Sequence, residues 1–387
     1  MRRIVVVGAS LAGLATARAL RGAGYDGDVA LVGDEPHRPY DRPPLSKGFL
    51  AGALSPEDLA LETDEDLALD WHLGARAVAL DPGTRTVTLA SGATLAGDAV
   101  VVATGSHARR LPGPPLAGVH TLRTLDDALA LRAELQPGAR LVLVGAGFVG
   151  AEIASTARRL GLEVTLVEAA ASPLAGPLGI EVGAMVARLH DTHGVPLITG
   201  VPVAGPVGRT RVSGVELADG RVLPADVVVV GVGSVAATGW LTASGLRLEA
   251  GGVACDSSGA TTAPGVYAVG DVAAWHDPSY AGHRRIEHWT DALQRPARTV
   301  SALLGEPVAA PLPPPYFWSE QYGVQVQFAG RRRGDETVTV EAGSPETGDV
   351  LAVYRRGEVP VAVLGMNQPR LFGRIRRQLS TPIQEFA

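Results

Sequence analysis

Two segments of the chain follow one plan, and this repeat constrains the fold more than any other feature. Each segment begins with a short run of β-branched and aliphatic residues, at positions 4–7 and 141–144. A glycine-containing turn, an alanine-rich stretch and a second apolar run follow, and the second run lies at positions 29–32 and 164–167. A strand, turn, helix and strand within about 30 residues form the βαβ crossover of a parallel sheet. The sequence therefore predicts two α/β domains of the same construction.

The turn of the second repeat reads Gly145-Ala146-Gly147-Phe148-Val149-Gly150, a complete G-x-G-x-x-G between a predicted strand and a predicted helix. The first glycine permits the tight turn, the second lets the backbone approach a pyrophosphate, and the third packs the helix on the strand. The diphosphate is then held at the positive end of the helix. Glu168, at the end of the next strand, can accept hydrogen bonds from both adenosine ribose hydroxyls and repels a 2′-phosphate. The turn therefore predicts a dinucleotide site that prefers NADH to NADPH.

The turn of the first repeat has serine where the second repeat has its middle glycine, in the order Gly8, Ser10, Gly13. Asp34 follows the second strand and is placed to hold a ribose, which indicates another dinucleotide site. Ser10 could instead be only the N-cap of a helix. The run from Gly8 to Ala12 also approximates the nucleophile elbow of hydrolases, but that reading needs an acid and a histidine late in the chain. The dinucleotide interpretation is preferred.

Further apolar runs at positions 99–103 and 226–230 are short and rich in valine, which is typical of buried strands. Asp271 follows another predicted strand, where its carboxylate could accept a hydroxyl group from a polyol chain or simply form a Gly-Asp turn. Pro311, Pro313, Pro314 and Pro315 predict a non-helical linker. Beyond this linker we expect a small α+β domain, with strands at 324–328, 337–341, 350–354 and 359–365 and a helix at 370–379.

Composition excludes several classes of protein. The 387 residues carry a formal net charge of -6, which argues against a dedicated nucleic-acid binder. No apolar stretch is long enough for a membrane helix. A single cysteine, Cys255, excludes a disulfide framework and fits a reducing compartment. The sequence predicts a cytoplasmic protein that binds neither nucleic acid nor membrane.

In combination, these segments resemble the FAD- and NAD-binding reductases of the putidaredoxin reductase type, the ferredoxin reductases of oxygenase systems. The most specific segment is the proline-rich run at positions 38–47, Arg-Pro-Tyr-Asp-Arg-Pro-Pro-Leu-Ser-Lys. Further segments match in order and spacing, at 103–105, 122–125, 285–289 and 317–322 together with the Gly-Asp pair at Asp271. The resemblance covers nearly the whole chain.

The resemblance implies an α/β fold with two Rossmann-like dinucleotide-binding domains, arranged as in glutathione reductase, and a small C-terminal α+β domain. The expected boundaries are 1–107 with 234–308 for the FAD-binding domain, 108–233 for the NAD-binding domain and 309–387 for the C-terminal domain. The residues expected to bind FAD are Gly8, Ser10, Ala12, Gly13, Asp34, Arg42, Lys47, Val78, Ala103, Thr104, Gly105, Arg123, Asp271 and Trp289. Those expected to bind NAD are Gly145, Gly147, Phe148, Val149, Gly150, Glu152, Glu168 and Gly233.

The same resemblance implies that Lys47 and Glu152 form the catalytic pair, with the lysine near the flavin N5. A buried lysine needs a partner, and a cation near N5 stabilises electron density that arrives on the ring. The alternative is a purely structural ion pair. The chain departs from the family pattern at Ser10, at positions 175–177, at positions 233–237, which lack the usual Pro-Asn, and in a short C-terminus.

The function that the resemblance implies is hydride transfer from NADH to FAD, followed by single-electron transfer to a small [2Fe-2S] ferredoxin that serves a cytochrome P450 or a Rieske oxygenase. The alternatives are an NADH oxidase or rubredoxin reductase, and an interaction protein similar to apoptosis-inducing factor. A single cysteine cannot supply the redox pair of glutathione-reductase-like enzymes. Cys255, in a segment that we expect to be peripheral, is interpreted as a small buried side chain. The protein is expected to be a monomer or a weak dimer.

Because ferredoxins are typically acidic, a basic docking surface is expected. Three groups of arginines are candidates, and an ordinary solvated surface is the alternative for each of them. Trp318 is interpreted as an aromatic side chain between the flavin and the surface, through which electrons leave. The candidate arginines are Arg109 and Arg110, then Arg331, Arg332 and Arg333, and finally Arg370, Arg374, Arg376 and Arg377.

Overall fold

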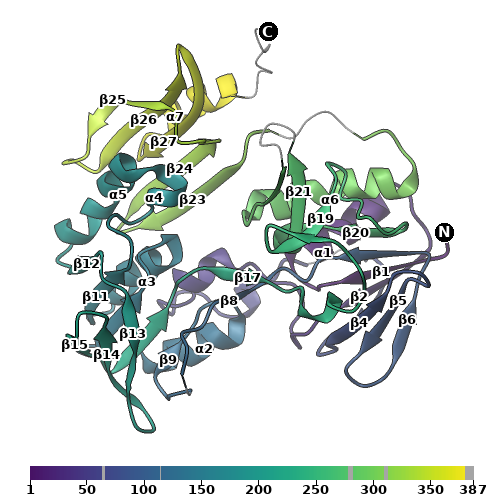
Figure 1. Cartoon of the computed structure of the whole chain (residues 1–387), viewed down its shortest axis with the longest axis horizontal. Helices are drawn as coiled ribbons and strands as arrows, with labels where there is room; N and C mark the ends of the chain where they lie inside the picture. Colours follow the sequence, from purple (N-terminus) through teal and green to yellow (C-terminus); the bar gives the residue numbers. More distant parts are fainter. Residues whose placement is uncertain (63–65, 114, 278–281, 309–312, 380–387) are drawn as a thin grey trace. The chain divides into compact units, whose positions relative to one another are not determined.

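A computed structural model describes residues 1–62, 66–113, 115–277, 282–308 and 313–379, and the chain divides into two compact units (Figure 1). The first unit consists of Met1–Asp41, Leu59–His107 and Ser234–Pro313. The second consists of Arg42–Asp58, Ala108–Gly233 and Pro314–Ala387. The three-domain division predicted from the sequence remains a proposal. The two compact units differ from the three predicted domains in two ways: residues 42–58 and the C-terminal segment both belong to the unit that contains the second nucleotide fold.

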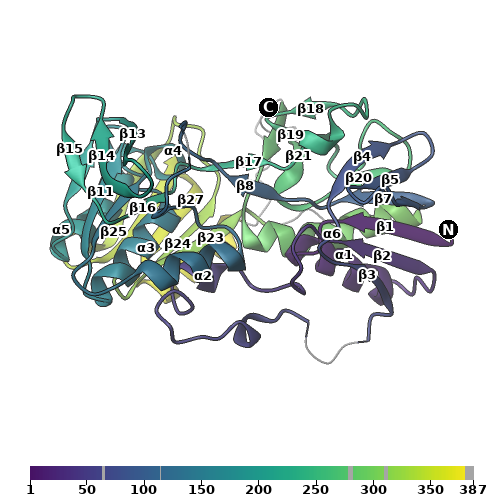
Figure 2. The ribbon, with the colours of Figure 1, turned by 90° about the horizontal axis from the view of Figure 1, so that it is seen from below.

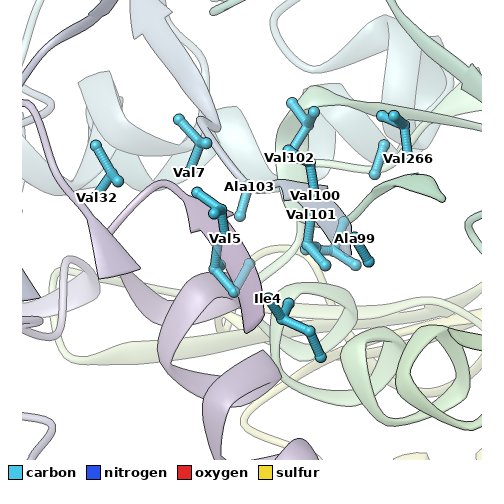
Figure 3. Close-up of a cluster of buried hydrophobic side chains, with 14 of the residues drawn as sticks. Ile4, Val5, Val7, Val32, Ala99, Val100, Val101, Val102, Ala103 and Val266 are labelled. Carbon is cyan, nitrogen blue, oxygen red and sulfur yellow. The ribbon is translucent and has the colours of Figure 1, made fainter. Parts of the chain in front are cut away.

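The first unit is built on a parallel sheet whose central strand is β1 (Arg3–Val7). β1 pairs with β2 on one side, where Val5 is opposite Ala30, and with β7 on the other, where Val5 is opposite Val100. These valine-rich strands are almost fully buried, and Figure 3 shows their side chains gathered in one core. A sheet covered on both faces requires such continuous apolar runs. The other strands are β2 (Asp28–Val32), β3 (Leu69–His72), β7 (Ala99–Val102) and β20 (Val266–Ala268).

Helices α1 (Leu11–Gly22) and α6 (Trp289–Leu304) pack against each other in this unit (Figure 2). α6 ends at Gly305, whose φ of +78° is the left-handed conformation that commonly terminates a helix. The remaining strands form a sheet of β4 (Ala77–Asp81), β5 (Thr86–Leu89) and β6 (Thr94–Ala96), a ribbon of β8 (Ser106–Ala108) and β17 (Ser234–Ala236), and a sheet of β18 (Leu248–Glu249), β19 (Gly252–Cys255), β21 (Ala273–Asp277) and β22 (Gly282–Arg285).

Cys255 lies in β19, and only 2% of its surface is exposed. Its thiol donates to the backbone carbonyl of Ala274 over 3.5 Å, and burial raises the pKa of the thiol well above its usual range. The expected small buried side chain is thus confirmed. The expectation of a peripheral segment was wrong, because the run from Gly252 to Cys255 pairs with β21 inside a sheet.

The second unit repeats the central part of the first sheet. Its central strand β10 (Arg140–Val144) pairs in parallel with β11 and β16, as β1 pairs with β2 and β7. The predicted repeat is therefore confirmed at the level of topology. The unit also contains the helices α2 (Leu125–Glu134) and α3 (Phe148–Arg159), the strands β9 (Val119–His120), β11 (Glu163–Glu168), β12 (Leu197–Thr199) and β16 (Val227–Val230), and an antiparallel sheet of β13 (Val203–Gly208), β14 (Val212–Leu217) and β15 (Val222–Pro224).

The C-terminal sheet of the second unit is antiparallel and has helices on both faces (Figure 1). Successive side chains of a strand point to opposite faces of the sheet. Ala352 and Tyr354 therefore pack with α5 on one face, whereas Leu351 and Val353 pack with α7 on the other. The elements are β23 (Tyr316–Gln321), β24 (Val324–Gly330), β25 (Thr337–Ser344), β26 (Asp349–Arg356), β27 (Val359–Met366), α4 (Ala175–Leu178), α5 (Ile180–Thr192) and α7 (Pro369–Leu379). The four predicted strands and the predicted helix are confirmed, and β23 was not predicted.

Short 3-10 turns complete the described chain, at η1 (Pro43–Ser46), η2 (Glu57–Leu59), η3 (Gly239–Leu241) and η4 (Gly270–Val272). Pro313, Pro314 and Pro315 lie outside any helix, as predicted, and Pro311 falls outside the described residues. In the part of the chain that the structure describes, no helix is long and apolar enough to cross a membrane.

Candidate functional site

The first glycine of each fingerprint is held against the end of a neighbouring strand. Gly8 has a φ of +127°, and a Cβ atom there would lie 2.1 Å from the carbonyl oxygen of Ala103. Gly145 has a φ of +100°, and its Cβ would lie 2.4 Å from the carbonyl oxygen of Gly231. Neither position can accept a side chain, so the tight turn in each unit requires glycine.

The third glycine of each fingerprint packs the helix onto the turn. A Cβ at Gly13 would lie 1.9 Å from the carbonyl oxygen of Gly8, and one at Gly150 would lie 2.3 Å from that of Gly145. These contacts bring the first turns of α1 and α3 directly behind the loops. The N-terminal N–H groups of both helices then face the loop, where they can bind an anion.

The middle position differs between the two fingerprints. Gly147 has an ordinary φ of −74°, and a Cβ there would meet no heavy atom within 4 Å. The fold itself therefore does not require glycine at this position, and open space beside the backbone fits the close approach of a diphosphate. Ser10 occupies the corresponding place in the first unit, where it is the N-cap residue of α1 but makes no side-chain capping hydrogen bond.

Asp271 lies beside the first fingerprint. Gly270, with a φ of +68°, packs so closely on α1 that a Cβ there would lie 2.8 Å from the Cβ of Ala12. Ser106 Oγ donates to Asp271 Oδ2 over 3.2 Å, and Arg285 Nε donates to the Asp271 carbonyl over 3.0 Å. The Gly-Asp segment is thus tied into the fold around the N-terminus of α1, and it is more than an isolated surface turn.

The other expected FAD-binding residues of the first unit lie at strand and helix ends. Thr104 Oγ1 donates to the carbonyl of Ala237 over 2.9 Å. Trp289, the first residue of α6, donates from Nε1 to Asp41 Oδ1 over 2.7 Å. The remaining positions are Ala103 and Gly105 after β7, Asp34 after β2, where it is exposed, and Val78 in β4, which is 44% exposed.

Glu168 is fixed at the end of β11 next to the second fingerprint. Its Oε2 accepts from the backbone N–H of Ala146 over 3.0 Å, and its Oε1 accepts from that of Ala170 over 2.9 Å. The carboxylate is therefore oriented by the loop whose glycines approach a dinucleotide. Phe148 and Val149 begin α3, and Gly233 has a φ of +94° and accepts the N–H of Arg109 over 2.9 Å.

Lys47 and Glu152 form an ion pair in the second unit. Lys47 Nζ lies 2.7 Å from Glu152 Oε2, and Glu152 is only 5% exposed. Ser46 donates to the same oxygen over 2.6 Å, and Ser319 donates to Oε1 over 2.7 Å. Both oxygens are therefore satisfied, as a buried charge requires. The catalytic role of the pair stays a prediction.

The Lys47 segment is anchored to α3 at a second point. Thr156 Oγ1 donates to the carbonyl of Ser46 over 2.8 Å, and Lys47 Nζ also donates to the carbonyl of Pro43 over 3.0 Å. These bonds explain why residues 42–58 join the second unit. Arg42 donates to the backbone carbonyl of Arg123, which directly precedes the capping residue of α2.

Sequence reasoning did not identify Ser46, Ser319 and Gln321 as part of this network. Gln321 Nε2 donates to Ser319 Oγ over 3.1 Å, and both side chains are fully buried. Phe317, Ser319 and Gln321 alternate along the chain and therefore share one face of the strand. The two polar residues on this face were the sequence signal that could have indicated the network. It becomes informative only once residues 316–321 are known to form a strand.

A histidine and a tyrosine pack where the C-terminal sheet meets α5. His190 Nδ1 lies 2.8 Å from the hydroxyl of Tyr322, and the ring of His193 stacks on Tyr322 at 4.4 Å. Burial and the neighbouring His193 lower the pKa of His190 from 6.5 to about 4. The backbone N–H of Tyr322 donates to Ser155 Oγ of α3 over 2.7 Å.

The candidate docking residues fall into different environments. Trp318 is half-buried in β23 and stacks with Tyr316. Arg332 is half-buried over the ring of Tyr354, with Glu336 3.9 Å away, so this cluster is partly used within the fold. The exposed arginines are Arg109, Arg110, Arg333, Arg370, Arg374 and Arg377, whereas Arg331 and Arg376 are half-buried.

The described residues fit the two predicted dinucleotides. Each unit presents a glycine turn, a helix N-terminus behind it and an acidic residue near the end of the second strand, at Asp34 in the first and Glu168 in the second. This combination can hold a diphosphate and a ribose.

Comparison with known proteins also indicates a dinucleotide-binding oxidoreductase. Residues 2–295 match the family described as pyridine nucleotide-disulphide oxidoreductase, and residues 316–384 match the family described as reductase C-terminal. A relative from Paraburkholderia xenovorans, the ferredoxin–NAD(+) reductase component of a biphenyl dioxygenase system, is 40% identical, covering 98% of this chain and 93% of its own. Putidaredoxin reductase CamA of Pseudomonas putida is 34% identical, covering 97% and 90%.

Solved structures agree with this. The reductase in a covalent putidaredoxin reductase–putidaredoxin complex has a TM-score of 0.92 at 33% identity, covering 98% of this chain and 93% of that one. The crystal structure named Fdr9 has a TM-score of 0.88 at 40% identity, covering 98% and 95%. The predicted fold class and resemblance are confirmed, and the hydrolase reading of the first turn is set aside. The chain belongs to the pyridine nucleotide-disulphide oxidoreductase family and carries the C-terminal domain of its reductases.

Proposed function

We propose that this protein is an FAD-dependent NADH:ferredoxin reductase. One observation carries the choice of electron acceptor. The chain has two dinucleotide folds but a single cysteine, Cys255, which is buried in a strand. No dithiol within the chain can accept the electrons, so they must leave to another molecule. The relatives named as ferredoxin reductases of dioxygenase systems support a ferredoxin as that molecule.

FAD, when bound, accepts two electrons together and releases them singly. In the first unit, the Gly8–Gly13 turn and the N-terminus of α1 would face its pyrophosphate, and Asp34 would hold the adenosine ribose. Asp271, already oriented by Ser106, has a carboxylate suited to the hydroxyls of the ribityl chain.

NADH would bind at the second fingerprint. The open space beside Gly147 admits the pyrophosphate, and the Glu168 carboxylate offers acceptors to the adenosine ribose hydroxyls. The same carboxylate repels a 2′-phosphate, and residues 169–171 are alanines that offer no cation to bind one. NADH is therefore the expected nucleotide.

Lys47 would supply a positive charge at the reacting end of the flavin. Glu152 holds the ammonium group at 2.7 Å, and the hydroxyls of Ser46 and Ser319 keep the carboxylate in place. The Lys47 ammonium group is thus held in place before any nucleotide binds. Electrostatic stabilisation of a charged product requires a charge that is oriented in advance in this way.

We further propose that the ferredoxin serves an oxygenase, either a Rieske dioxygenase or a cytochrome P450, and that the protein is a monomer or a weak dimer. A cytoplasmic location stays a prediction of the sequence.

An anaerobic assay tests the function. The purified flavoprotein is mixed with NADH and putidaredoxin, and the iron–sulfur absorbance is followed, with NADPH as the matched control. We expect fast bleaching with NADH and slow bleaching with NADPH. If NADH reduces the bound flavin but every [2Fe-2S] ferredoxin in a broad panel stays oxidised, and a parallel aerobic assay shows that oxygen is consumed instead, the protein is an NADH oxidase and the proposal is wrong.

A further inference from the structure

We infer that the exposed face of α7 formed by Arg370, Arg374 and Arg377, here called the α7 arginine face, docks an acidic protein partner. Given the proposed function, on which this inference rests, that partner is the small iron–sulfur protein that receives the electrons.

The α7 arginine face is the outer side of a strongly amphipathic helix. Phe372 and Ile375 are 2% and 4% exposed and pack on the C-terminal sheet with Leu351 and Val353. The three arginines project from the opposite side and are exposed (Figure 1 shows α7 on the sheet). The helix is therefore fixed in place by its core side, and the charges are presented on a rigid element.

The charges on this face repel one another. Arg370 and Arg374 are four residues apart and Arg374 and Arg377 three apart, the spacings at which helical side chains are neighbours. α7 contains no acidic residue. Within the ranges that the structure describes, no carboxylate lies within 4.0 Å of any of these three guanidinium groups. The arrangement is unfavourable in the isolated protein and becomes favourable when an anionic partner covers it.

Other arginines of the same sheet are used within the fold. Arg356 lies 3.0 Å from both Asp335 and Glu336, and Arg355 pairs with Glu341. Arg332 lies over the ring of Tyr354. The α7 arginine face thus differs from the surrounding surface, where positive charge is matched by carboxylates.

β23 connects the α7 arginine face to the nucleotide fold. Tyr316 lies under the Arg376 guanidinium at 4.0 Å, and its ring centroid is 6.0 Å from those of Phe372 and Trp318. The alternate residues of the strand face α3, where Phe317 packs on Phe148 at 4.7 Å and Ser319 bonds Glu152. A partner on α7 is separated from the helix of the second fingerprint by a single strand. Arg109 and Arg110, in a loop before α2, have no comparable link among the described contacts.

The net negative charge of the whole chain favours a small acidic protein over an extended polyanion as the partner. The chain carries a net charge of -6, so a nucleic acid or an anionic membrane would be repelled over most of the surface. A compact acidic protein needs only one local positive face and would be attracted to it, with an affinity that falls as salt rises.

The test compares two double variants with the same change in charge. R374E/R377E reverses the α7 arginine face, and R109E/R110E reverses an exposed pair elsewhere in the second unit. Binding of putidaredoxin to each FAD-loaded protein is measured by calorimetry at ionic strengths of about 0.01 and 0.15 M. We expect R374E/R377E to lose at least about tenfold in affinity at low salt and most of its salt dependence. R109E/R110E should stay within about twofold of the parent.

Several results would overturn the inference. R374E/R377E binding as tightly as the parent would do so, as would an equal loss in R109E/R110E or equally tight binding of a short DNA duplex by the parent. FAD content and the rate of flavin bleaching by NADH, which we expect to be unchanged in both variants, show that each has folded. R370Q/R374Q/R377Q, which only neutralises the face, provides a milder variant and should lose affinity in the same direction. If the parent itself neither binds nor reduces any ferredoxin, the proposed function fails, and that result is distinct from a failure of the docking face.

Discussion

Ser319 donates its hydroxyl to Glu152 Oε1 over 2.7 Å, from a strand of the C-terminal sheet to a helix of the second nucleotide fold. The other oxygen of Glu152 accepts from Ser46 and faces the Lys47 ammonium group. The C-terminal sheet therefore contributes directly to holding the Lys47–Glu152 ion pair.

The first prediction concerns this bond. Ser319→Ala removes a donor from a buried carboxylate, so we expect the free energy of unfolding to fall by about 1.5–3 kcal/mol, the range for hydrogen bonds to charged groups. Urea unfolding at neutral pH measures the loss. Ser319→Thr keeps the hydroxyl and should recover most of it. Equal stability of the alanine variant and the parent would show that the bond contributes nothing.

A second prediction uses the difference between the fingerprint glycines. Gly147→Ala should leave the unfolding free energy within about 0.5 kcal/mol of the parent, because φ is ordinary and the site is open. The methyl group should weaken NADH binding about tenfold, or about 1.4 kcal/mol, because it occupies the approach to the backbone. The affinity for NADH is measured by adding NADH to the protein and following the protein fluorescence.

Gly145→Ala is the matched control for that experiment. Its Cβ would lie 2.4 Å from the carbonyl of Gly231, in a backbone conformation that disfavours alanine. It should therefore lose stability as well as NADH affinity. If Gly147→Ala bound NADH as tightly as the parent, the nucleotide would not approach the backbone at this position.

A third prediction concerns nucleotide choice. Glu168→Gln retains the shape and an acceptor oxygen but removes the charge that repels a 2′-phosphate. We expect the ratio of kcat/KM for NADH over NADPH to fall about tenfold, which corresponds to about 1.4 kcal/mol. Steady-state rates with both nucleotides measure the ratio. Glu163→Gln, at the exposed start of the same strand, is the control and should leave the ratio unaltered.

A fourth prediction concerns acid stability. The pKa of His190 is lowered from 6.5 to about 4, so the native state keeps this imidazole neutral while the unfolded chain takes up a proton below 6.5. Above pH 6.5 the imidazole is neutral in both states and its burial costs no protonation energy. As the pH falls toward 4, proton uptake by the unfolded chain lowers the free energy of unfolding by as much as about 3 kcal/mol. Urea midpoints at several pH values across this range should fall in the parent.

His190→Gln removes the titrating group, so its stability should depend less steeply on pH over the same range. His107→Gln changes an exposed histidine and should follow the parent. If His190→Gln lost as much stability as the parent on acidification, the pH dependence would have to come from other groups, such as the half-buried His288, whose pKa is also lowered by desolvation.

Much of the fold could be predicted because it depends on local patterns. The valine runs of β1, β7, β10 and β16 are buried on both faces, and such strands remain recognisable without knowledge of their neighbours. The glycines at 8, 13, 145 and 150 are required by contacts within their own βαβ units, which the spacing of the fingerprints already describes.

The network around Glu152 could not be predicted in the same way. Ser46 and Ser319 lie 106 and 167 residues from Glu152 in the chain, and their role depends on how three separate segments pack. β23 was missed although Tyr, Phe and Trp favour strands, because the Ser-Glu-Gln that follows is polar and these residues join the strand through pairing with β24. For the same reason, residues 42–58 were expected in the first nucleotide fold, whereas their side chains bond to α3.

The burial of Cys255 has a practical consequence. Its thiol is inside a sheet and has a raised pKa, so thiol reagents that attack the thiolate have little access to it. A new cysteine introduced on the surface would then be the one position open to a maleimide fluorophore or a nitroxide spin label. The natural sequence already serves as a background for site-specific labelling, so spectroscopic distances across either unit can be measured without first removing a native cysteine.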